Sequence, residues 1–425
     1  MNIKSRLTLL NFLEFAVWGA YLTSMGGYLA QVGLGPYIGY FYSVQGFVSL
    51  VMPALMGIVA DRWMQAQRVL SLCHLLSGTF MVSAGLYGFL AKDSVEFSIL
   101  FSLYTLSVAF FMPTIALTNS VCYNALDRAG LDSVKAFPPI RVFGTVGFIV
   151  SMWIVDLAGW QKTSGQFMWS GALSLLLSVY ALSMPRCEPG KSQAGGGLLQ
   201  ALGLDAFKLF RNYRMALFFI FSMLLGCCLQ ITNGYAGPFL QSFASNEIYQ
   251  GTFGVDHANI LISLSQISET LCILLIPFCL SRFGIKRVML MAMLAWTLRF
   301  GFFAIGDPGS GVWLLILSMI VYGIAFDFFN ISGSLFVDRE TDIHIRNSAQ
   351  GVFMMMTNGF GAAVGMLMAG WIMNIYTVND GGLMVSKPGT GGWSEAWWIF
   401  SLYSLFVAIL FAFMFRYEHK ETPSK

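Results

Sequence analysis

The sequence has little charge for its length. Only 11% of its 425 residues are Asp, Glu, Lys or Arg, whereas 56% are hydrophobic. A soluble domain carries about 25% charged residues. The mean hydropathy of +0.68 indicates a protein dissolved in lipid. With about 20 apolar residues per crossing, a chain of this length can cross a bilayer roughly ten to fourteen times. The net charge of +3 is too small to indicate binding to nucleic acid.

Metal-ligand and catalytic patterns are also lacking. The seven cysteines lie within or at the ends of apolar runs, without the spacing of metal ligands, so we interpret them as small buried hydrophobes. No nucleophile and base stand at catalytic spacing, so we expect neither an enzyme nor a cofactor. The first apolar run contains Asn11 and Glu14 and is longer than a signal-peptide core, so we expect it to remain as the first helix.

Apolar runs bounded by polar residues, Gly or Pro predict an all-α membrane protein with twelve transmembrane helices. The predicted helices cover residues 7–31, 37–60, 67–91, 96–125, 138–159, 165–186, 213–243, 254–281, 286–306, 312–337, 345–376 and 392–416. The longest polar stretch, residues 187–212, reads as a cytoplasmic linker. It separates an N-terminal six-helix half, residues 1–186, from a C-terminal six-helix half, residues 213–425.

The distribution of Lys and Arg predicts the orientation. With the N-terminus in the cytoplasm, only Lys92, Lys162 and Lys387 fall in outer loops, and Arg141 and Arg299 fall within spans. All the other Lys and Arg residues, of 24 in the chain, lie on the cytoplasmic side. Because cytoplasmic loops carry an excess of these residues, we expect both termini in the cytoplasm.

A short motif recurs in the two predicted halves. GIVADRWMQAQRVL (57–70) follows the second predicted helix, and PFCLSRFGIKRVML (277–290) follows the eighth. Parallel repeats of this kind build transporters whose site lies between the halves. The first copy resembles the loop motif of the major facilitator superfamily, although Trp63 and Met64 stand where a glycine is usual. We predict that Asp61 and Arg62 form part of a cytoplasmic gate; the alternative is an ordinary solvated charge pair.

Asp327 is the most informative single residue. It lies with Asn330 near the middle of an apolar segment, residues 318–337. An ionised carboxylate at the centre of such a helix costs about 2.5–3.5 kcal/mol even on the lenient insertion scale, so such residues normally face a cavity or a partner. A functional acid and a structural aspartate tied to a neighbouring helix are both compatible with this position.

Two predicted helices carry polar pairs at helical spacing. Gln230 and Asn233 stand three residues apart in LQITN, and Gln266 and Glu269 stand three apart in SQISET. Amides and a carboxylate suit a solute rich in hydroxyl and carbonyl groups, such as a ribose and the edge of a base. Hydrogen bonding between helices, worth about 0.6 kcal/mol on average, is the alternative.

The fifth predicted helix begins with FPPIRVFGTVGF. Pro138 and Pro139 suit a first helical turn. Arg141, Thr145 and Phe148 follow at a spacing that places them on one face, which favours a cavity. Alternatively, the arginine side chain reaches the lipid headgroups.

Tyr322 and Phe326 share a stripe of the tenth predicted helix, where their rings can stack on a flat heterocycle. The chain has 38 Phe residues, most of which must face lipid or other helices. Asp327 lies about 100° round the helix from Phe326, so it can border the cavity without touching the solute. The roles of Glu14 and Arg299, also within spans, are left open.

The chain resembles the nucleoside:proton symporter family of the major facilitator superfamily from end to end. The motifs that carry this resemblance are FPPIRVFGTVGFIV, LQITN, SQISET, RFGIK, MIVYGIAFDFFNISGS and SAQG. The resemblance implies a permease of the bacterial inner membrane that imports nucleosides with protons, without a metal or cofactor, and we expect a monomer. It implies a substrate site of Arg141, Thr145, Phe148, Gln230, Asn233, Gln266, Glu269, Tyr322 and Phe326.

By the same resemblance Asp327 is the proton-coupling acid, with Glu269 as the alternative. Broad nucleoside permeases and xanthosine permeases share these motifs, so the preferred nucleoside stays open. Two other functions also stay open. One is a symporter for a sugar or another small solute on the same scaffold. The other is a membrane receptor that does not transport, which the short loops disfavour.

Overall fold

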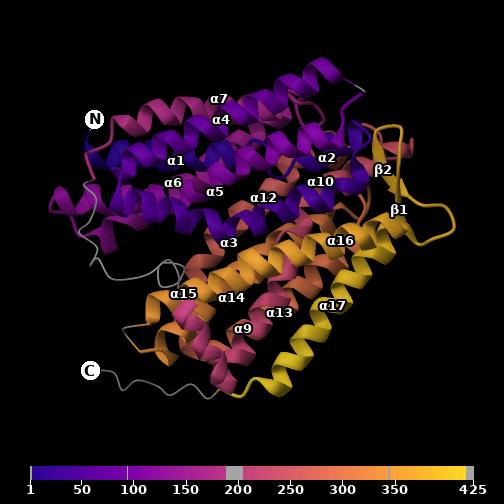
Figure 1. Ribbon diagram of the computed structural model, residues 1–425. Coiled ribbons are helices and arrows are strands. Elements are labelled where there is room, and N and C mark those ends of the chain that lie inside the picture. Colours follow the sequence, from indigo (N-terminus) through magenta and orange to yellow (C-terminus); the bar gives the residue numbers. More distant parts are fainter. Residues whose placement is uncertain (1, 93, 188–203, 343–344, 418–425) are drawn as a thin grey trace.

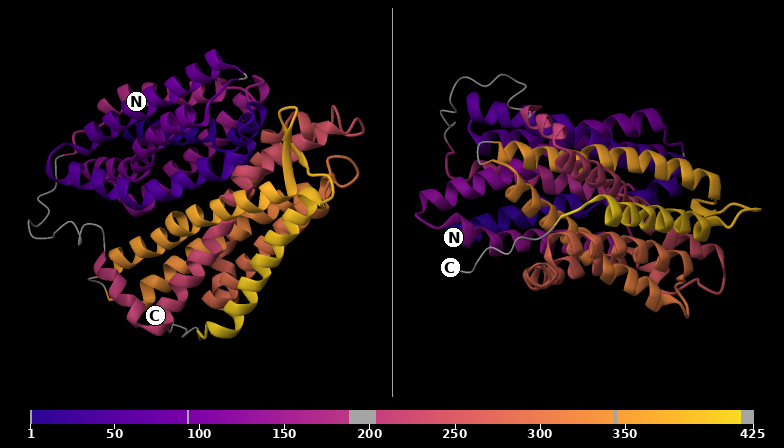
Figure 2. Two further views of the ribbon diagram at one scale, coloured as in Figure 1. Left: turned by 45° about the vertical axis from the view of Figure 1, so that its right-hand side comes forward. Right: turned by 90° about the horizontal axis from the view of Figure 1, so that it is seen from below.

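In the computed structural model, the chain is described at residues 2–92, 94–187, 204–342 and 345–417. Nearly all of these residues are helical, and most of the helices run along one long axis of the molecule (Figure 1). The helices before the central linker lie together, and those after it form a second group beside them (Figure 2).

The first group contains eight elements. They are α1 (Ile3–Gly19), α2 (Met25–Gln31), η1 (Gly35–Tyr37), α3 (Ile38–Arg62), α4 (Ala66–Ala91), α5 (Phe97–Arg128), α6 (Ser133–Leu157) and α7 (Gly165–Leu182). Helix α4 packs on α5 and α7, and α1 packs on α6.

The second group begins after the linker. It contains η2 (Leu204–Arg211), α9 (Tyr213–Leu229), α10 (Ile231–Ser242), η3 (Phe243–Ser245), α11 (Phe253–Asp256), α12 (Ala258–Cys272), η4 (Ile273–Leu275), α13 (Ile276–Ile305), α14 (Val312–Glu340), α15 (Arg346–Met354), the π-helical segment η5 (Met355–Gly361), α16 (Ala362–Tyr376), β1 (Thr377–Asp380), β2 (Leu383–Ser386) and α17 (Gly392–Met414). Helix α13 packs on α14 and α17. The two groups meet chiefly where α3 contacts α16 and where α6 contacts α12.

Within the described ranges, ten helical segments are long and apolar enough to cross a membrane. Two differences from the prediction explain why the number is not twelve. The span predicted at 7–31 is divided into α1 and α2 by a turn at residues 20–24. The two spans predicted at 254–281 and 286–306 form one segment, 258–305, in which Gly284 has a left-handed φ of 74°. Residues with a side chain rarely adopt this conformation, so glycine permits the chain to change direction there.

Two local expectations were wrong. Helix α6 begins at Ser133, so Pro138 and Pro139 lie inside the helix rather than in its first turn. Without backbone N–H groups, neither proline can donate a helical hydrogen bond. The other correction is the antiparallel pair of strands β1 and β2, which makes the chain not strictly all-α. Gly381 and Gly382 both have positive φ at the turn, as a tight two-residue hairpin requires.

The β1–β2 hairpin lies at the opposite end of the molecule from the start of α1 and the end of α17 (Figure 1). It belongs to the second group but also contacts α2 and η1 of the first. Met384 of the hairpin is buried, and its carbonyl oxygen accepts a hydrogen bond from the Trp393 indole (2.8 Å).

Glycines allow helices to approach closely both within the second group and between the groups. A Cβ atom at Gly365 would overlap the backbone of Cys227, so α16 lies directly against α9. Between the groups, a Cβ at Gly39 would lie 3.0 Å from the Cα of Gly370, and one at Gly46 would lie 2.7 Å from the carbonyl oxygen of Gly359. At these two glycines the backbone of α3 therefore lies directly against that of α16 and η5.

Candidate functional site

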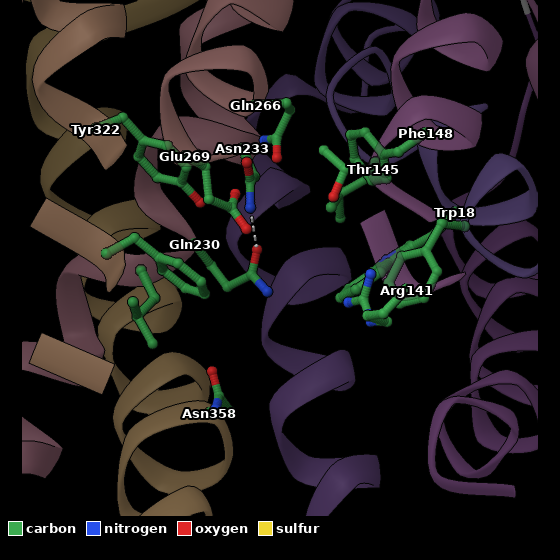
Figure 3. Close-up of a pocket in the computed structure, with 14 residues that line it drawn as sticks. Trp18, Arg141, Thr145, Phe148, Gln230, Asn233, Gln266, Glu269, Tyr322 and Asn358 are labelled. Carbon is green, nitrogen blue, oxygen red and sulfur yellow. Dashed lines mark hydrogen bonds between the residues drawn. The ribbon is translucent and has the colours of Figure 1, made fainter. Parts of the chain in front are cut away.

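A cavity of about 170 Å³ lies between the two groups of helices (Figure 3). The elements around it are α1, α6, α9, α10, α12, α14 and η5. The residues that line it are Phe15, Trp18, Leu22, Arg141, Thr145, Phe148, Leu229, Gln230, Asn233, Gln266, Glu269, Tyr322, Phe326 and Asn358. All the residues predicted to bind substrate are thus brought together in one place, although their role in binding stays a prediction.

Helix α6 supplies the wall on the side of the first group. Arg141, Thr145 and Phe148 all line the cavity, so the arginine does not extend to the headgroups. Its guanidinium carbon lies 3.8 Å from the centre of the Phe15 ring, a cation–π contact. Phe148 meets Trp18 edge to face, with ring centres 6.3 Å apart. On this wall, a single cation therefore lies among aromatic rings.

The amide pair lies where α9 passes into α10. Gln230 occupies the junction, and Asn233 is in the first turn of α10. The Asn233 side-chain amide donates to the Gln230 side-chain oxygen (2.8 Å), which fixes the two side chains relative to each other. The Gln230 amide nitrogen and the Asn233 amide oxygen are not used in this bond, so one donor and one acceptor can face a solute.

Helix α12 contributes Gln266 and Glu269, which face the cavity opposite Arg141 (Figure 3). The charges of Glu269 and Arg141 attract each other across the cavity. An acid and a guanidinium group therefore face each other from opposite groups of helices. A solute with both hydroxyl groups and a polar heterocycle can form hydrogen bonds with both of these side chains.

Helix α14 supplies the aromatic side of the cavity. Tyr322 and Phe326 are stacked, with ring centres 5.7 Å apart and planes inclined by 16°. Asp327, the next residue, is 5% exposed and is not part of the lining. It lies close enough to Glu269 for their charges to repel. Its Oδ2 atom has no hydrogen-bond partner among the described residues, which argues against an aspartate tied to a neighbouring helix.

Sequence reasoning missed five of the lining residues, namely Phe15, Trp18, Leu22, Leu229 and Asn358. Four of them are apolar and resemble the rest of any membrane helix, so they carried no signal. Asn358 is an amide within a span and could have been noticed. By contrast Asn330, noticed in the sequence, is absent from the lining and donates to the carbonyl oxygen of Phe326 in its own helix (3.0 Å).

The predicted cytoplasmic gate is only partly visible. Arg62 is the last residue of α3. The side chain of Asp61 lies outside the described part of the structure. Their pairing therefore stays a prediction.

A cluster of polar contacts joins the two groups at the end of the molecule near the hairpin. The Asp156 carboxylate of α6 lies 2.6 Å from the His257 ring nitrogen Nδ1. Its second oxygen accepts from the backbone N–H groups of Asn259 (3.1 Å) and Ile260 (3.2 Å). A carboxylate of one group thus caps the first turn of α12 in the other. Nearby, the Gln161 side chain donates to the carbonyl oxygen of Asp256 (3.0 Å).

Glu14 lies away from the cavity, inside the first group. Its carboxylate is 2.9 Å from His74, and both side chains are at most 1% exposed. It also accepts hydrogen bonds from Thr114 (2.5 Å) and Thr118 (3.0 Å). The acid is therefore fully engaged in joining α1, α4 and α5. Among the described residues, no group of His, Cys, Asp and Glu has the arrangement of a metal site.

A bundle of membrane-spanning helices in two groups, with a polar cavity between them, defines a multi-pass membrane transporter. Residues 1–420 match the family described as nucleoside H⁺ symporter, so the chain belongs to that family. It is 49% identical over 422 residues to the xanthosine permease of Escherichia coli K12, covering 99% of this chain and 97% of that protein. It is 46% identical to the nucleoside permease NupG of the same organism, covering 100% and 98%.

Solved structures agree with this assignment. A crystal structure of a point mutant of the nucleoside transporter NupG superposes with a TM-score of 0.91 at 45% identity, covering 98% of this chain and 100% of that one. The xylose transporter XylE from E. coli has a TM-score of 0.61 at 13% identity, covering 96% and 98%, which shows a shared fold alone.

Proposed function

We propose that this protein imports nucleosides together with protons across the bacterial inner membrane, and that it does so by alternating access. One observation carries the proposal. The residues that the family resemblance assigned to a nucleoside come from α6, α10, α12, α14 and the α9–α10 junction, yet they line a single cavity between the two groups of helices. Such a position allows the cavity to open to either side as the groups move.

The chemistry of the cavity suits a nucleoside. Gln230, Asn233, Gln266 and Glu269 offer amide donors, amide acceptors and a carboxylate for ribose hydroxyls and a base edge. The stacked rings on α14 offer a face for a flat heterocycle, a contact worth about 1–3 kcal/mol per base in nucleic-acid systems. Xanthosine permease and NupG are both relatives, so this reasoning applies to purine and pyrimidine nucleosides alike.

For the topology, we propose twelve crossings in two six-helix halves, 1–186 and 213–425, joined by the linker 187–212. In this arrangement α1 and α2 together form the first crossing, and segment 258–305 makes two crossings that divide near Gly284. With an even number of crossings, the start of α1 and the end of α17 lie at the same end of the molecule, opposite the hairpin (Figure 1). The Lys and Arg distribution makes that end cytoplasmic. Of the linker, residues 188–203 lie outside the described residues.

For the proton, we propose Asp327 as the carrier, with Glu269 as the alternative. The two acids lie close enough for their charges to repel, and Asp327 is buried, so a shared proton removes much of the cost of holding both. Asp327 is buried behind the lining and can exchange a proton without contacting the solute. Glu269 faces the solute and Arg141, so a proton there would compete with substrate contacts.

For the conformational cycle, we propose that the Asp156 cluster closes the outer side in the observed form. These hydrogen bonds join α6 to α11 and α12 and must break before the cavity opens outward. On the opposite side, Asp61 and Arg62 would form part of the gate that closes the cytoplasmic end in the outward-open form. We also propose that the transporter works as a monomer, since both groups of helices in one chain contribute to the lining of the cavity.

The test is uptake of labelled uridine and adenosine into membrane vesicles with and without a proton gradient. An electrical drop of 100 mV is worth about 2.3 kcal/mol per proton, which corresponds to roughly 50-fold accumulation. We expect a proton ionophore to abolish accumulation. Uptake that follows sodium, or ignores both gradients, would contradict the coupling. Competition by disaccharides but not nucleosides would favour a sugar symporter, and binding without uptake would favour a receptor.

A further inference from the structure

We propose that Arg299 is a positioning residue that fixes three walls of the cavity relative to one another. It lies on α13, which contributes no residue to the lining. The proposal rests on the proposed function, because it assigns Arg299 to the same nucleoside site.

Arg299 is a buried cation without an ionic partner. It is 2% exposed, and no ion pair among the described residues includes it. A guanidinium group within a membrane span is costly even on the lenient insertion scale. Such a residue is normally held by several hydrogen bonds or serves a site. Here three hydrogen bonds hold it, and each leads to a different wall of the cavity.

The three bonds reach α10, α12 and α14. One terminal nitrogen donates to the Ser265 hydroxyl (3.2 Å) and to the Ser318 carbonyl oxygen (2.8 Å), and the other donates to the Thr232 hydroxyl (3.0 Å). The Ser318 hydroxyl donates back to the Arg299 carbonyl oxygen (2.9 Å), so α13 and α14 are joined in both directions. The planar guanidinium group fixes the angles between these bonds as well as their lengths.

Each partner stands beside a cavity residue. Thr232 precedes Asn233, and Ser265 precedes Gln266. Ser318 lies one helical turn before Tyr322. A displacement of any one of these helices is therefore transmitted to the arginine and resisted by the other two. One side chain sets the spacing between the Gln230–Asn233 pair, the Gln266–Glu269 pair and the aromatic stack on α14.

A fourth contact holds the aromatic wall directly. The guanidinium carbon of Arg299 lies 4.4 Å from the centre of the Tyr322 ring, a cation–π distance. Trp296 meets the same ring edge to face, with ring centres 5.9 Å apart. The ring that lines the cavity is thus fixed from behind by a cation and an indole.

The experiment compares nucleoside affinity with turnover in Arg299→Lys. Lysine keeps the positive charge and much of the side-chain volume. Its single ammonium group, however, cannot replace the planar guanidinium group, whose two terminal nitrogens bond to three partners. Because lysine cannot keep all three hydrogen bonds, the walls lose their fixed spacing, and we expect the Kd for uridine to rise on the order of tenfold or more. The maximal rate of uridine counterflow should change much less. Thr232→Val, which removes only the bond beside Asn233, should give a smaller rise in Kd.

The matched control is Thr297→Ala, two residues away on the same helix. Thr297 bonds to Ser404 of α17 (3.0 Å), on the side away from the cavity, so its removal should leave the Kd unchanged. If Arg299→Lys lowers the maximal rate and the folded yield but leaves the Kd at the wild-type value, the residue is only structural and the proposal is wrong.

Backbone hydrogen exchange gives a second readout that needs no substrate. In Arg299→Lys, protection should fall around Thr232, Ser265 and Ser318 and be retained in α17. Unchanged protection at those three positions, or equal loss throughout the second group, would overturn the proposal. If wild-type protein bound no nucleoside, the proposed function would fail, and the exchange pattern would still decide whether Arg299 joins the three walls.

Discussion

Removing the Asp156 carboxylate should open the cavity toward the hairpin end. In Asp156→Ala the protein loses the 2.6 Å contact with His257 and both caps on the first turn of α12. A charge-assisted hydrogen bond contributes about 1.5–3 kcal/mol, and a helix cap about 1 kcal/mol. All these interactions join the two groups of helices, so their loss destabilises the closed form specifically. The total of about 2.5–4 kcal/mol corresponds to a shift of roughly 10²–10³ in the conformational equilibrium.

The assay measures the distance between spin labels on the two groups. The seven cysteines are all buried. Leu157 at the end of α6 is 71% exposed and Ile248 in the second group is 79% exposed, so Leu157→Cys and Ile248→Cys offer accessible labelling sites. We expect Asp156→Ala to populate a longer distance that is minor in the parent protein. Asp156→Asn, which keeps an acceptor for one cap, should give a smaller shift.

The control is Asp132→Asn, at the other end of α6. Asp132 pairs with Lys135 at 3.6 Å in an exposed position, an interaction worth at most about 1 kcal/mol. It should not change the distance distribution. If Asp156→Ala folds normally and shows the same distances as the parent protein, the cluster does not hold the outer side closed and the reasoning is refuted.

Three further predictions concern the site and its packing. Asp327→Asn should abolish accumulation driven by the proton gradient while uridine counterflow continues; loss of binding as well would place Asp327 in the solute site. Gln266→Ala and Glu269→Ala should each raise the Kd for uridine on the order of tenfold, and normal affinity in a binding assay would make α12 purely structural. Gly365→Ala should destabilise the protein by about 1–3 kcal/mol in thermal unfolding, because its methyl group would overlap the Cys227 backbone; an unchanged Tm would show that α16 can move aside.

Helical spacing predicted the walls of the cavity well. Arg141, Thr145 and Phe148 were placed on one face, and that face does line the cavity. The same holds for Gln266 and Glu269. These predictions succeed because polar residues in lipid are costly and their spacing fixes their face, so the pattern leaves few arrangements.

The parts that were missed depend on backbone geometry or on distant partners. Asn358 lies in the π-helical segment η5, where the spacing of side chains departs from that of an α-helix. The turn at residues 20–24 interrupts an apolar run that reads as one helix. Asp156 was not singled out in the sequence, because its partners His257 and Asn259 lie about a hundred positions further along the chain.

The β1–β2 hairpin was missed although the sequence contains a turn signal. NDGG is a typical tight turn, and the strands on either side of it are each only four residues long. The segment was interpreted as part of an outer loop, since neither strand is long enough to show a clear alternation.

In the orientation proposed above, the β1–β2 hairpin lies on the outer surface of the transporter. The hairpin belongs to the second group but also contacts α2 and η1 of the first, so the outward opening proposed above would have to break those contacts. In that orientation, an antibody fragment that bound the hairpin and the first group together should hold them in contact from outside the cell and so prevent the proposed conformational change. Such a fragment would neither enter the cavity nor compete with the nucleoside for it.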